Sequence, residues 1–336
     1  MPSTVAFSRS AANVFFHILT QCNLSCRHCY INPAQHGRRR LGLTTIRRWL
    51  AVLAERSPAA NLVLLGGEPT LHPELAGVVR AARKLGYASV TIDTNGYLFN
   101  GILERVTPAH VDFFSFSLDG ATAAVNDALR GQGSYDACTA GIGRAKAAGF
   151  RTSLIYTVSE RNLHELQRMP DLLARLGVDH FFIQVIGLRG QSAAGGGDAG
   201  LQVTREAWLQ AVPEVARAVA RQGIPVTYPK VYLSSEEPFE CAGRVADNYF
   251  VFPNGRVYRC PLCEDFPLHS LRFDGSALQP ASRLNERDLF ALDIAEGCVM
   301  NKLIQPGNLA YGPDGRPLYK VACCLLKEQL QPGPAA

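Results

Sequence analysis

Residues 13–30 read NVFFHILTQCNLSCRHCY and join an apolar run to a loop that carries three cysteines. The run Asn13–Thr20 is rich in β-branched and aromatic residues, which favours a buried strand. The loop after it holds Cys22, Cys26 and Cys29 in the spacing C-x3-C-x2-C. Three soft thiolates from one short loop suit an iron–sulfur cluster or a zinc ion. The sequence therefore places a metal-binding loop at the end of its first predicted strand.

Similar apolar runs recur along the first two thirds of the chain, and each is followed by a turn and a segment with helical periodicity. Such alternation predicts a parallel sheet covered by helices. We expect an α/β fold, namely a partial (β/α)6 TIM-like barrel, with a doubly wound sheet as the alternative. The further predicted strands are Asn61–Leu65, Ser89–Asp93, Val111–Leu118, Phe150–Val158 and His180–Ile186. A helix is expected to start at Thr44 or Thr45 and another to cover Arg205–Arg221, with Gly86, Gly149, Gly177 and Gly223 at helix ends.

Polar motifs lie directly after several of these strands. The second strand leads into Gly-Gly-Glu-Pro-Thr (66–70), the third into Asp-Thr-Asn-Gly (93–96), and the fourth ends in Ser-Phe-Ser-Leu-Asp-Gly (115–120). Because the C-terminal ends of parallel barrel strands meet at one rim, where active sites lie, we expect these residues to form one site. Thr94, Asn95 and Gln184 are expected to line the same mouth.

The chain changes character after its predicted helix 205–221. From there on, the alternation of predicted strands and helices ends, and the sequence contains many prolines and six cysteines. This composition predicts a small, irregular, Cys-rich C-terminal domain. We place the core domain at residues 13–222 and the second domain at 223–336. The turn Pro253-Asn254-Gly255 predicts a hairpin that brings Cys241 and Cys260 together. Cys138 is expected to be a buried small hydrophobe.

The composition argues against a nucleic-acid-binding protein and against a membrane-spanning protein. The 336 residues are 47% hydrophobic and carry 34 basic and 29 acidic side chains, a net charge of +5 that is too weak to indicate nucleic-acid binding. No apolar segment is long enough to span a membrane, and clustered cysteines favour metal binding in a reducing, cytoplasmic setting. Arg38–Arg40 are expected to be solvated, with an acidic-peptide site as the alternative. The small and polar residues of segment 187–200 predict a mobile loop. This loop is expected to be either a lid over the site or a flexible surface connection without a role.

The C-x3-C-x2-C spacing, the aromatic Tyr30 after it and the Gly-Gly-Glu-Pro motif after the second strand together resemble the radical S-adenosylmethionine (radical SAM) superfamily over about residues 13–220. The resemblance implies a partial (β/α)6 barrel. It also implies that Cys22, Cys26 and Cys29 hold a [4Fe-4S] cluster whose open iron binds SAM. One electron, from a reductant such as flavodoxin or ferredoxin, would then cleave SAM to methionine and a 5′-deoxyadenosyl radical.

The same resemblance implies which residues contact SAM. Glu68 would accept a hydrogen bond from the SAM amino group, and Arg130 would pair with the SAM carboxylate. Ser117 would contact the ribose, while Tyr30 and Ile186 would pack near the adenine. For two of these residues an alternative without a SAM contact stays open. Ser117 could face a neighbouring strand, and Arg130 could be a solvated loop residue. The complete predicted set is Tyr30, Gly66, Gly67, Glu68, Pro69, Ser117, Arg130 and Ile186.

The C-terminal cysteines resemble the opening of a SPASM or twitch extension, which binds auxiliary iron–sulfur clusters. Six cysteines are too few for two fully ligated four-cysteine clusters, so we expect one auxiliary [4Fe-4S] cluster. Its predicted ligands are Cys241 and Cys260 plus two of Cys263, Cys298, Cys323 and Cys324. Because neighbours in an extended chain point in opposite directions, we expect only one of Cys323 and Cys324 to be a ligand.

The function that follows is hydrogen-atom abstraction from a peptide or protein substrate by a maturase-like radical SAM enzyme. The first alternative is a radical SAM dehydrogenase or epimerase of a small molecule such as a sugar. A second alternative, from another class, is a non-catalytic binding module stabilised by zinc on Cys22, Cys26, Cys29 and either His28 or His36. Iron and sulfide analysis separates this last alternative from the enzymes.

Overall fold

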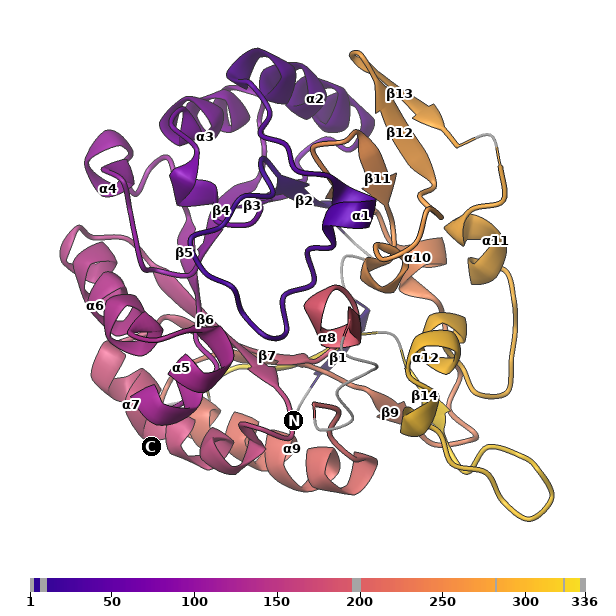
Figure 1. Ribbon diagram of the computed structural model, residues 1–336. Helices are drawn as coiled ribbons and strands as arrows, with labels where there is room; N and C mark the ends of the chain where they lie inside the picture. The colour runs from indigo at the N-terminus through magenta and orange to yellow at the C-terminus, as the bar shows by residue number, and fades with distance from the viewer. Residues whose placement is uncertain (1–2, 7–10, 195–200, 282, 323, 333–336) are drawn as a thin grey trace.

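The computed structural model describes residues 3–6, 11–194, 201–281, 283–322 and 324–332, and its strands form a curved sheet inside a ring of helices (Figure 1). Neighbouring strands from β2 to β7 pair in parallel and in chain order, which confirms the six predicted strands and the partial barrel. These strands are β2 (Asn13–His17), β3 (Asn61–Leu65), β4 (Ser89–Thr94), β5 (Phe113–Ser117), β6 (Thr152–Val158) and β7 (His180–Val185).

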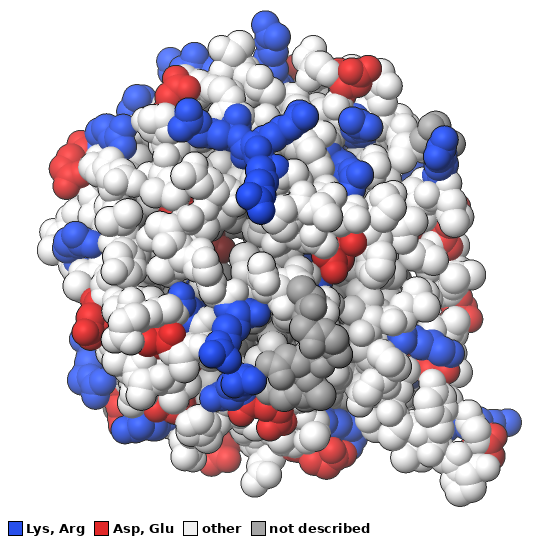
Figure 2. All heavy atoms as spheres, viewed as in Figure 1, with Lys and Arg blue, Asp and Glu red and all other residues white. Residues whose placement is uncertain are grey.

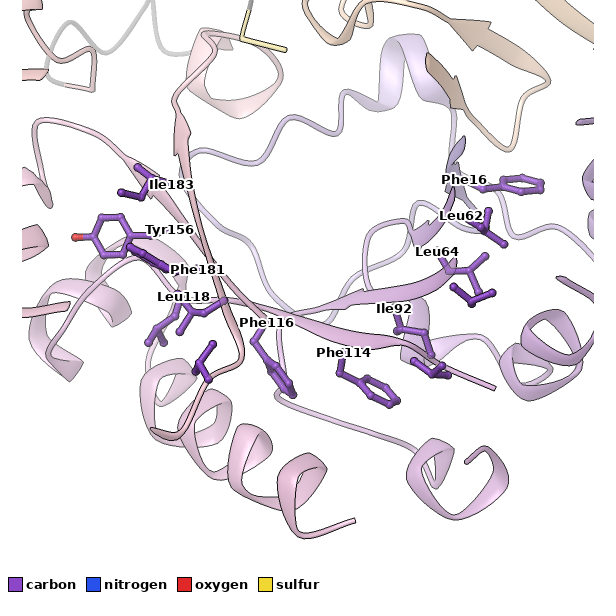
Figure 3. Packing of buried hydrophobic residues seen from close by; sticks show 14 of the residues in the cluster. Phe16, Leu62, Leu64, Ile92, Phe114, Phe116, Leu118, Tyr156, Phe181 and Ile183 are labelled. Atoms are coloured by element: carbon purple, nitrogen blue, oxygen red, sulfur yellow. The ribbon is translucent and has the colours of Figure 1, made fainter. Parts of the chain in front are cut away.

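The hydrophobic core lies between the outer face of the sheet and the helices. Side chains such as Phe16, Leu64, Ile92, Phe114 and Phe116 are buried and point outward from the barrel (Figure 3). Alternate residues of the same strands point the other way, into the barrel. The helices are α2 (Leu43–Arg56), α3 (Leu75–Lys84), α4 (Ile102–Arg105), α5 (Ala123–Arg130), α6 (Ser134–Ala147), α7 (Met169–Leu176) and α9 (Arg205–Arg221), with short α1 (Pro33–His36) and α8 (Gln191–Ala194).

Segments from both ends of the chain extend the barrel sheet at its two edges. Beyond β7, β8 (Val226–Pro229) pairs in parallel, and β15 (Leu326–Leu330) and β1 (Ser3–Ala6) follow antiparallel. Beyond β2, β10 (Asn248–Val251) pairs in parallel. Within the described parts of the chain, strands from both sides of residue 223 therefore share one 13-stranded sheet. The division into domains at that residue stays a prediction.

The C-terminal region is built from short elements around the cysteines. β10 and β11 (Arg256–Tyr258) form the predicted hairpin, with Gly255 in the left-handed region at a φ of +88°. Because Gly has no Cβ, it adopts this conformation without strain. The remaining elements are β9 (Tyr232–Leu233), α10 (Ala242–Val245), β12 (Leu271–Asp274), β13 (Ala277–Pro280), α11 (Glu286–Phe290), α12 (Val299–Ile304) and β14 (Lys320–Val321). 3₁₀ turns cover Pro69–Leu71, Leu163–Arg168, Pro261–Cys263 and Pro306–Asn308.

Two local predictions are wrong. Helix α2, which was expected to start at Thr44 or Thr45, begins at Leu43 with Gly42 as its N-cap, and no side chain caps it. Residues 187–194 are packed rather than loose, since Gln191 N donates to Cys29 O at 2.8 Å and Leu188 N to the Gln305 side chain at 2.8 Å. Residues 195–200 of the predicted loop lie outside the described residues.

Other local predictions are confirmed. The four glycines at predicted helix ends all have positive φ values, and α9 has the predicted bounds. Cys138 is buried in α6. None of the described helices combines the length and apolar composition that crossing a lipid bilayer requires.

Candidate functional site

A cavity of about 490 Å³ lies inside the barrel and reaches the loops at the C-terminal ends of its strands. Its wall carries side chains from the barrel strands, the three-cysteine loop and the C-terminal region. The volume is in the range of small-ligand sites. Most residues predicted for the site line this wall, namely Cys22, Cys26, Cys29, Tyr30, Gly66, Gly67, Glu68, Thr94, Asn95, Ser117, Arg130, Gln184 and Ile186.

The three thiols lie together on the cavity wall, and each is partly exposed. Burial raises the pKa of all three, that of Cys22 to about 11. Coordination of a metal must therefore displace their protons, and the metal charge would supply the compensation. The soft donor set and its open side fit an iron–sulfur cluster that leaves room for a ligand.

Asp119, just past the end of β5, ties the thiol loop to α5. Its carboxylate lies 2.9 Å from Nε2 of His28 and 2.6 Å from Nε of Arg130, and it accepts a hydrogen bond from Thr157 N. Burial opposes ionisation of Asp119, but Arg130 and His28 outweigh it and lower its pKa to about 2. Arg130 is 8% exposed, so its alternative reading as a solvated loop residue is wrong.

The glycines of the Gly-Gly-Glu-Pro motif let two loops touch. A Cβ on Gly67 would lie 2.1 Å from Gln21 O, and one on Gly66 would lie 2.4 Å from Leu19 O. The close approach allows Gly67 N to donate to Leu19 O and Glu68 N to Gln21 O. The loop after β3 thereby supports the first residues of the thiol loop.

Glu68 is buried, and its carboxylate accepts four hydrogen bonds. Oε1 accepts from the backbone and hydroxyl of Thr70 and from the hydroxyl of Thr94, while Oε2 accepts from Asn95 N at 2.8 Å. Because Oε1 accepts three of these hydrogen bonds, only Oε2 can accept a further one. The predicted contact of Glu68 with the SAM amino group stays a prediction.

The remaining predicted contacts divide into two groups. Tyr30, Ser117 and Ile186 line the cavity, and the Tyr30 hydroxyl donates to Nε2 of His17 at 2.7 Å. Pro69 does not line it, because it begins the 3₁₀ turn Pro69–Leu71 and is buried there. Its position supports a role in shaping the turn rather than a direct contact.

Arg189 connects the thiol loop to the C-terminal region. Its guanidinium lies over the Tyr30 ring at 4.8 Å, pairs with Glu264 and donates to Pro261 O at 2.5 Å. The Arg189 and Glu264 side chains are largely buried. The neighbour of Cys29 is therefore held against the segment that carries Cys260 and Cys263.

The described C-terminal cysteines form a second group beside the cavity. Cys241, Cys260 and Cys298 line a smaller pocket, Cys263 is buried next to them, and Cys324 lines the large cavity. Leu262 and Leu325 line both spaces and form the wall between them. Cys241 and Cys260 thus line the same pocket, and their role as ligands of one cluster stays a prediction. Cys323 lies outside the described residues.

The two histidines considered as zinc ligands, His28 and His36, both contact other groups. His28 pairs with Asp119, and both ring nitrogens of His36 form hydrogen bonds, one with Asn32 N and one with Glu264 O. Among the described residues, no group of three or more His, Cys, Asp or Glu side chains is arranged to hold a single metal ion.

Residues 17–173 match the family model of the radical SAM superfamily. Over this stretch, which is slightly less than half of its length, the chain is similar to the radical SAM superfamily. Its fold is similar to that of Streptococcus suis SuiB, solved with the precursor peptide SuiA, with a TM-score of 0.69 at 13% identity over 89% of this chain and 74% of SuiB. The likeness confirms the partial barrel and extends into the C-terminal region.

Two curated relatives match part of the chain. The chain is 29% identical to the pre-heme d1 synthase of Dinoroseobacter shibae, over 67% of this chain and 56% of the relative. It is 33% identical to the mycofactocin maturase MftC of Mycobacterium tuberculosis, over 46% of this chain and 40% of the relative. The matched segments thus span about half the length of these relatives.

The sequence did not predict three residues that build this site. Asp93, which lines the cavity, and Asp119, which holds Arg130 at its wall, stood inside motifs that were recognised, but nothing in their spacing showed these roles. Arg189 stood in a segment expected to be loose. Polar residues directly after predicted strands were the available signal for both aspartates.

Proposed function

We propose that this chain is a radical SAM enzyme that removes a hydrogen atom from a peptide or protein substrate. Cys22, Cys26 and Cys29 would hold the [4Fe-4S] cluster. When bound, the cluster and SAM would supply a 5′-deoxyadenosyl radical for this step. The observation that carries the proposal is the meeting of three thiols, Glu68 and Arg130 on the wall of one cavity.

The chain's own residues would position the cofactors. Asp119 holds Arg130 at the cavity wall, where the other guanidinium N–H groups can bind a carboxylate. Tyr30 is fixed between His17 and Arg189, which presents a rigid aromatic edge to the cavity. Apolar side chains such as Phe15 and Ile155 also line the cavity, and apolar walls would help to protect a reactive radical from water.

The C-terminal thiols support a role next to the substrate. We propose that Cys241 and Cys260, with two of the other C-terminal cysteines, hold one auxiliary [4Fe-4S] cluster. Asn301, Gln305 and Cys324 line the same cavity as the barrel residues, so a substrate there would touch both regions. SuiB was solved with a precursor peptide bound, and MftC is named a maturase, which supports a peptidic substrate for this chain.

The electron donor is the third part of the proposal. Residues 1–54 contain seven arginines and no aspartate or glutamate. Arg38, Arg39 and Arg40 are exposed, and Arg39 pairs with Thr20, two residues before Cys22, through a backbone hydrogen bond of 3.0 Å. Basic side chains gather on this face, over the segment between α1 and α2 (Figure 2). An acidic electron carrier such as flavodoxin or ferredoxin is the partner that this face would attract.

The direct test is product analysis. The full chain, reconstituted anaerobically with iron and sulfide, is incubated with SAM, dithionite and peptides encoded beside its gene. We expect 5′-deoxyadenosine and a peptide whose mass has decreased through loss of hydrogen. Modification of a sugar or another metabolite, with the peptides unchanged, would favour the small-molecule alternative. Absence of 5′-deoxyadenosine would contradict the radical SAM activity itself.

A further inference from the structure

Asp93 is a carboxylate in the cavity wall to which no role has been assigned above. It lies near the C-terminal end of β4, and its side chain lines the cavity. Its Oδ1 is buried and has no hydrogen-bond partner among the described residues. By contrast, Glu68, in the loop between β3 and β4, already accepts four hydrogen bonds. Since buried polar atoms are normally paired, Asp93 Oδ1 is available for a ligand.

The surroundings of Asp93 disfavour its charged form. Burial and, to a smaller extent, the charge of Glu68 raise the pKa of Asp93 to about 7, although Arg130 acts in the opposite direction. The Asp93 charge also contributes to the raised pKa of Tyr30, so Asp93 faces the thiol loop across the cavity. The other titratable groups on these walls include His17 at the end of β2 and Cys22.

The ligand that this carboxylate fits is a cation without hydrogen-bond donors. If the amino and carboxylate groups of SAM bind the cluster iron, the charge that remains is that of the sulfonium. A sulfonium has no N–H or O–H group, so a protein recognises it by charge. A carboxylate whose oxygens are not already saturated by donors is well suited to that task.

We propose that the Asp93 carboxylate is the counter-ion of the SAM sulfonium, an inference that rests on the proposed function. Asp93 must be ionised to act in this way, so SAM binding near pH 7 releases the proton that Asp93 otherwise keeps. The same carboxylate favours SAM over S-adenosylhomocysteine, whose sulfur is neutral. Asp93 would therefore also determine which of these two molecules the site retains.

The test compares wild type with Asp93→Asn, which keeps the shape and removes the charge. Affinities for SAM and S-adenosylhomocysteine are measured by anaerobic calorimetry on the reconstituted full chain, in buffers of different ionisation enthalpy. We expect the variant to bind SAM about tenfold to a hundredfold more weakly and S-adenosylhomocysteine within about twofold of wild type. Wild type should release more protons than the variant at pH 6.5. The control is Thr91→Val, an uncharged change in the same cavity wall.

The outcomes separate this inference from the proposed function. Equal SAM affinity and equal proton release in wild type and Asp93→Asn would overturn the inference alone. Equal weakening for SAM and S-adenosylhomocysteine would also overturn it, because a counter-ion acts on the charged ligand only. If SAM binds to neither protein although the cluster absorbance is intact, the proposed function fails as well. Thermal melting of both proteins shows whether Asp93→Asn is folded.

Discussion

Asp119 connects three segments that surround the cavity. One carboxylate connects His28 of the thiol loop, Arg130 of α5 and the backbone of β6. Its side chain is fully buried, and so is most of Arg130. Removing one partner from a buried ion pair leaves the other charge without compensation, which costs more than the pair itself contributes.

We therefore predict that Asp119→Asn lowers the free energy of unfolding by about 3 kcal/mol and weakens SAM binding, because Arg130 loses the carboxylate that holds it. The folded-state pKa of Asp119, about 2, lies below its ordinary value of 3.8. Its contribution to stability is thus complete above pH 3.8 and is lost as the pH falls towards 2. Denaturation at pH 4 to 8 should give a constant difference between wild type and variant. A difference below about 1 kcal/mol at pH 7 would contradict this role.

At this scale the sequence predicted the residues that stand in short, regular spacings. Cys22, Cys26, Cys29 and Glu68 could be placed together because their motifs directly follow strands. The pairing of Asp119 with His28 depends on contacts between segments about ninety residues apart, and no local pattern records it.

At the scale of elements, the contact between the loop after β3 and the thiol loop requires glycine. The φ of Gly67 is outside the left-handed region, so the requirement is for space alone. We predict that Gly67→Ala lowers the free energy of unfolding by about 2–3 kcal/mol and reduces cluster content, since the methyl group would overlap Gln21 O.

Gly143→Ala is the matched control for this change. Gly143 lies within α6, and a Cβ there would meet nothing within 4 Å. Alanine also favours the helix, so the control should be as stable as wild type or slightly more stable. Chemical denaturation measures the free energy of unfolding of both variants, and iron analysis measures their cluster content. Equal stability of the two alanine variants would show that the loops can separate without cost.

Element types were easier to predict than element ends and partners. The six barrel strands follow from continuous apolar runs, and the glycines at helix ends mark left-handed positions. The pairing of β10 with β2 and of β15 with β8 could not be predicted, because each joins strands more than ninety residues apart. The packing of residues 187–194 escaped prediction because small, polar residues indicate a loop whether or not it is packed.

At the scale of the molecule, the shared sheet places the C-terminal thiols next to the barrel cavity. β10 joins one barrel edge and β15 extends the other, so the segments that carry these cysteines are fixed at both sides. Leu262 and Leu325 are shared between the two pockets. This arrangement predicts two metal-binding groups that form independently, because neither uses the other's cysteines.

We predict that replacing Cys22, Cys26 and Cys29 with alanine abolishes SAM cleavage while the reconstituted chain retains about four irons, the content of one [4Fe-4S] cluster. Iron analysis and visible absorbance measure the clusters, and chromatography measures 5′-deoxyadenosine. Cys138→Ala is the control, since this buried cysteine belongs to neither group. Loss of all iron from the triple variant would contradict an auxiliary cluster, and about eight irons would indicate more than one.

The charge of the whole surface gives the last prediction, which concerns the electron donor. Replacing Arg38, Arg39 and Arg40 with glutamate turns the positive charge beside the thiol loop into negative charge. An acidic flavodoxin should then be repelled from this face rather than attracted to it. We expect 5′-deoxyadenosine formation with flavodoxin to slow about tenfold and to lose its dependence on salt, while the rate with dithionite stays unchanged. Reversal of the exposed Arg283, Arg287 and Arg316 changes the net charge equally and serves as control. If both triple variants slow equally, total charge rather than this face governs the encounter.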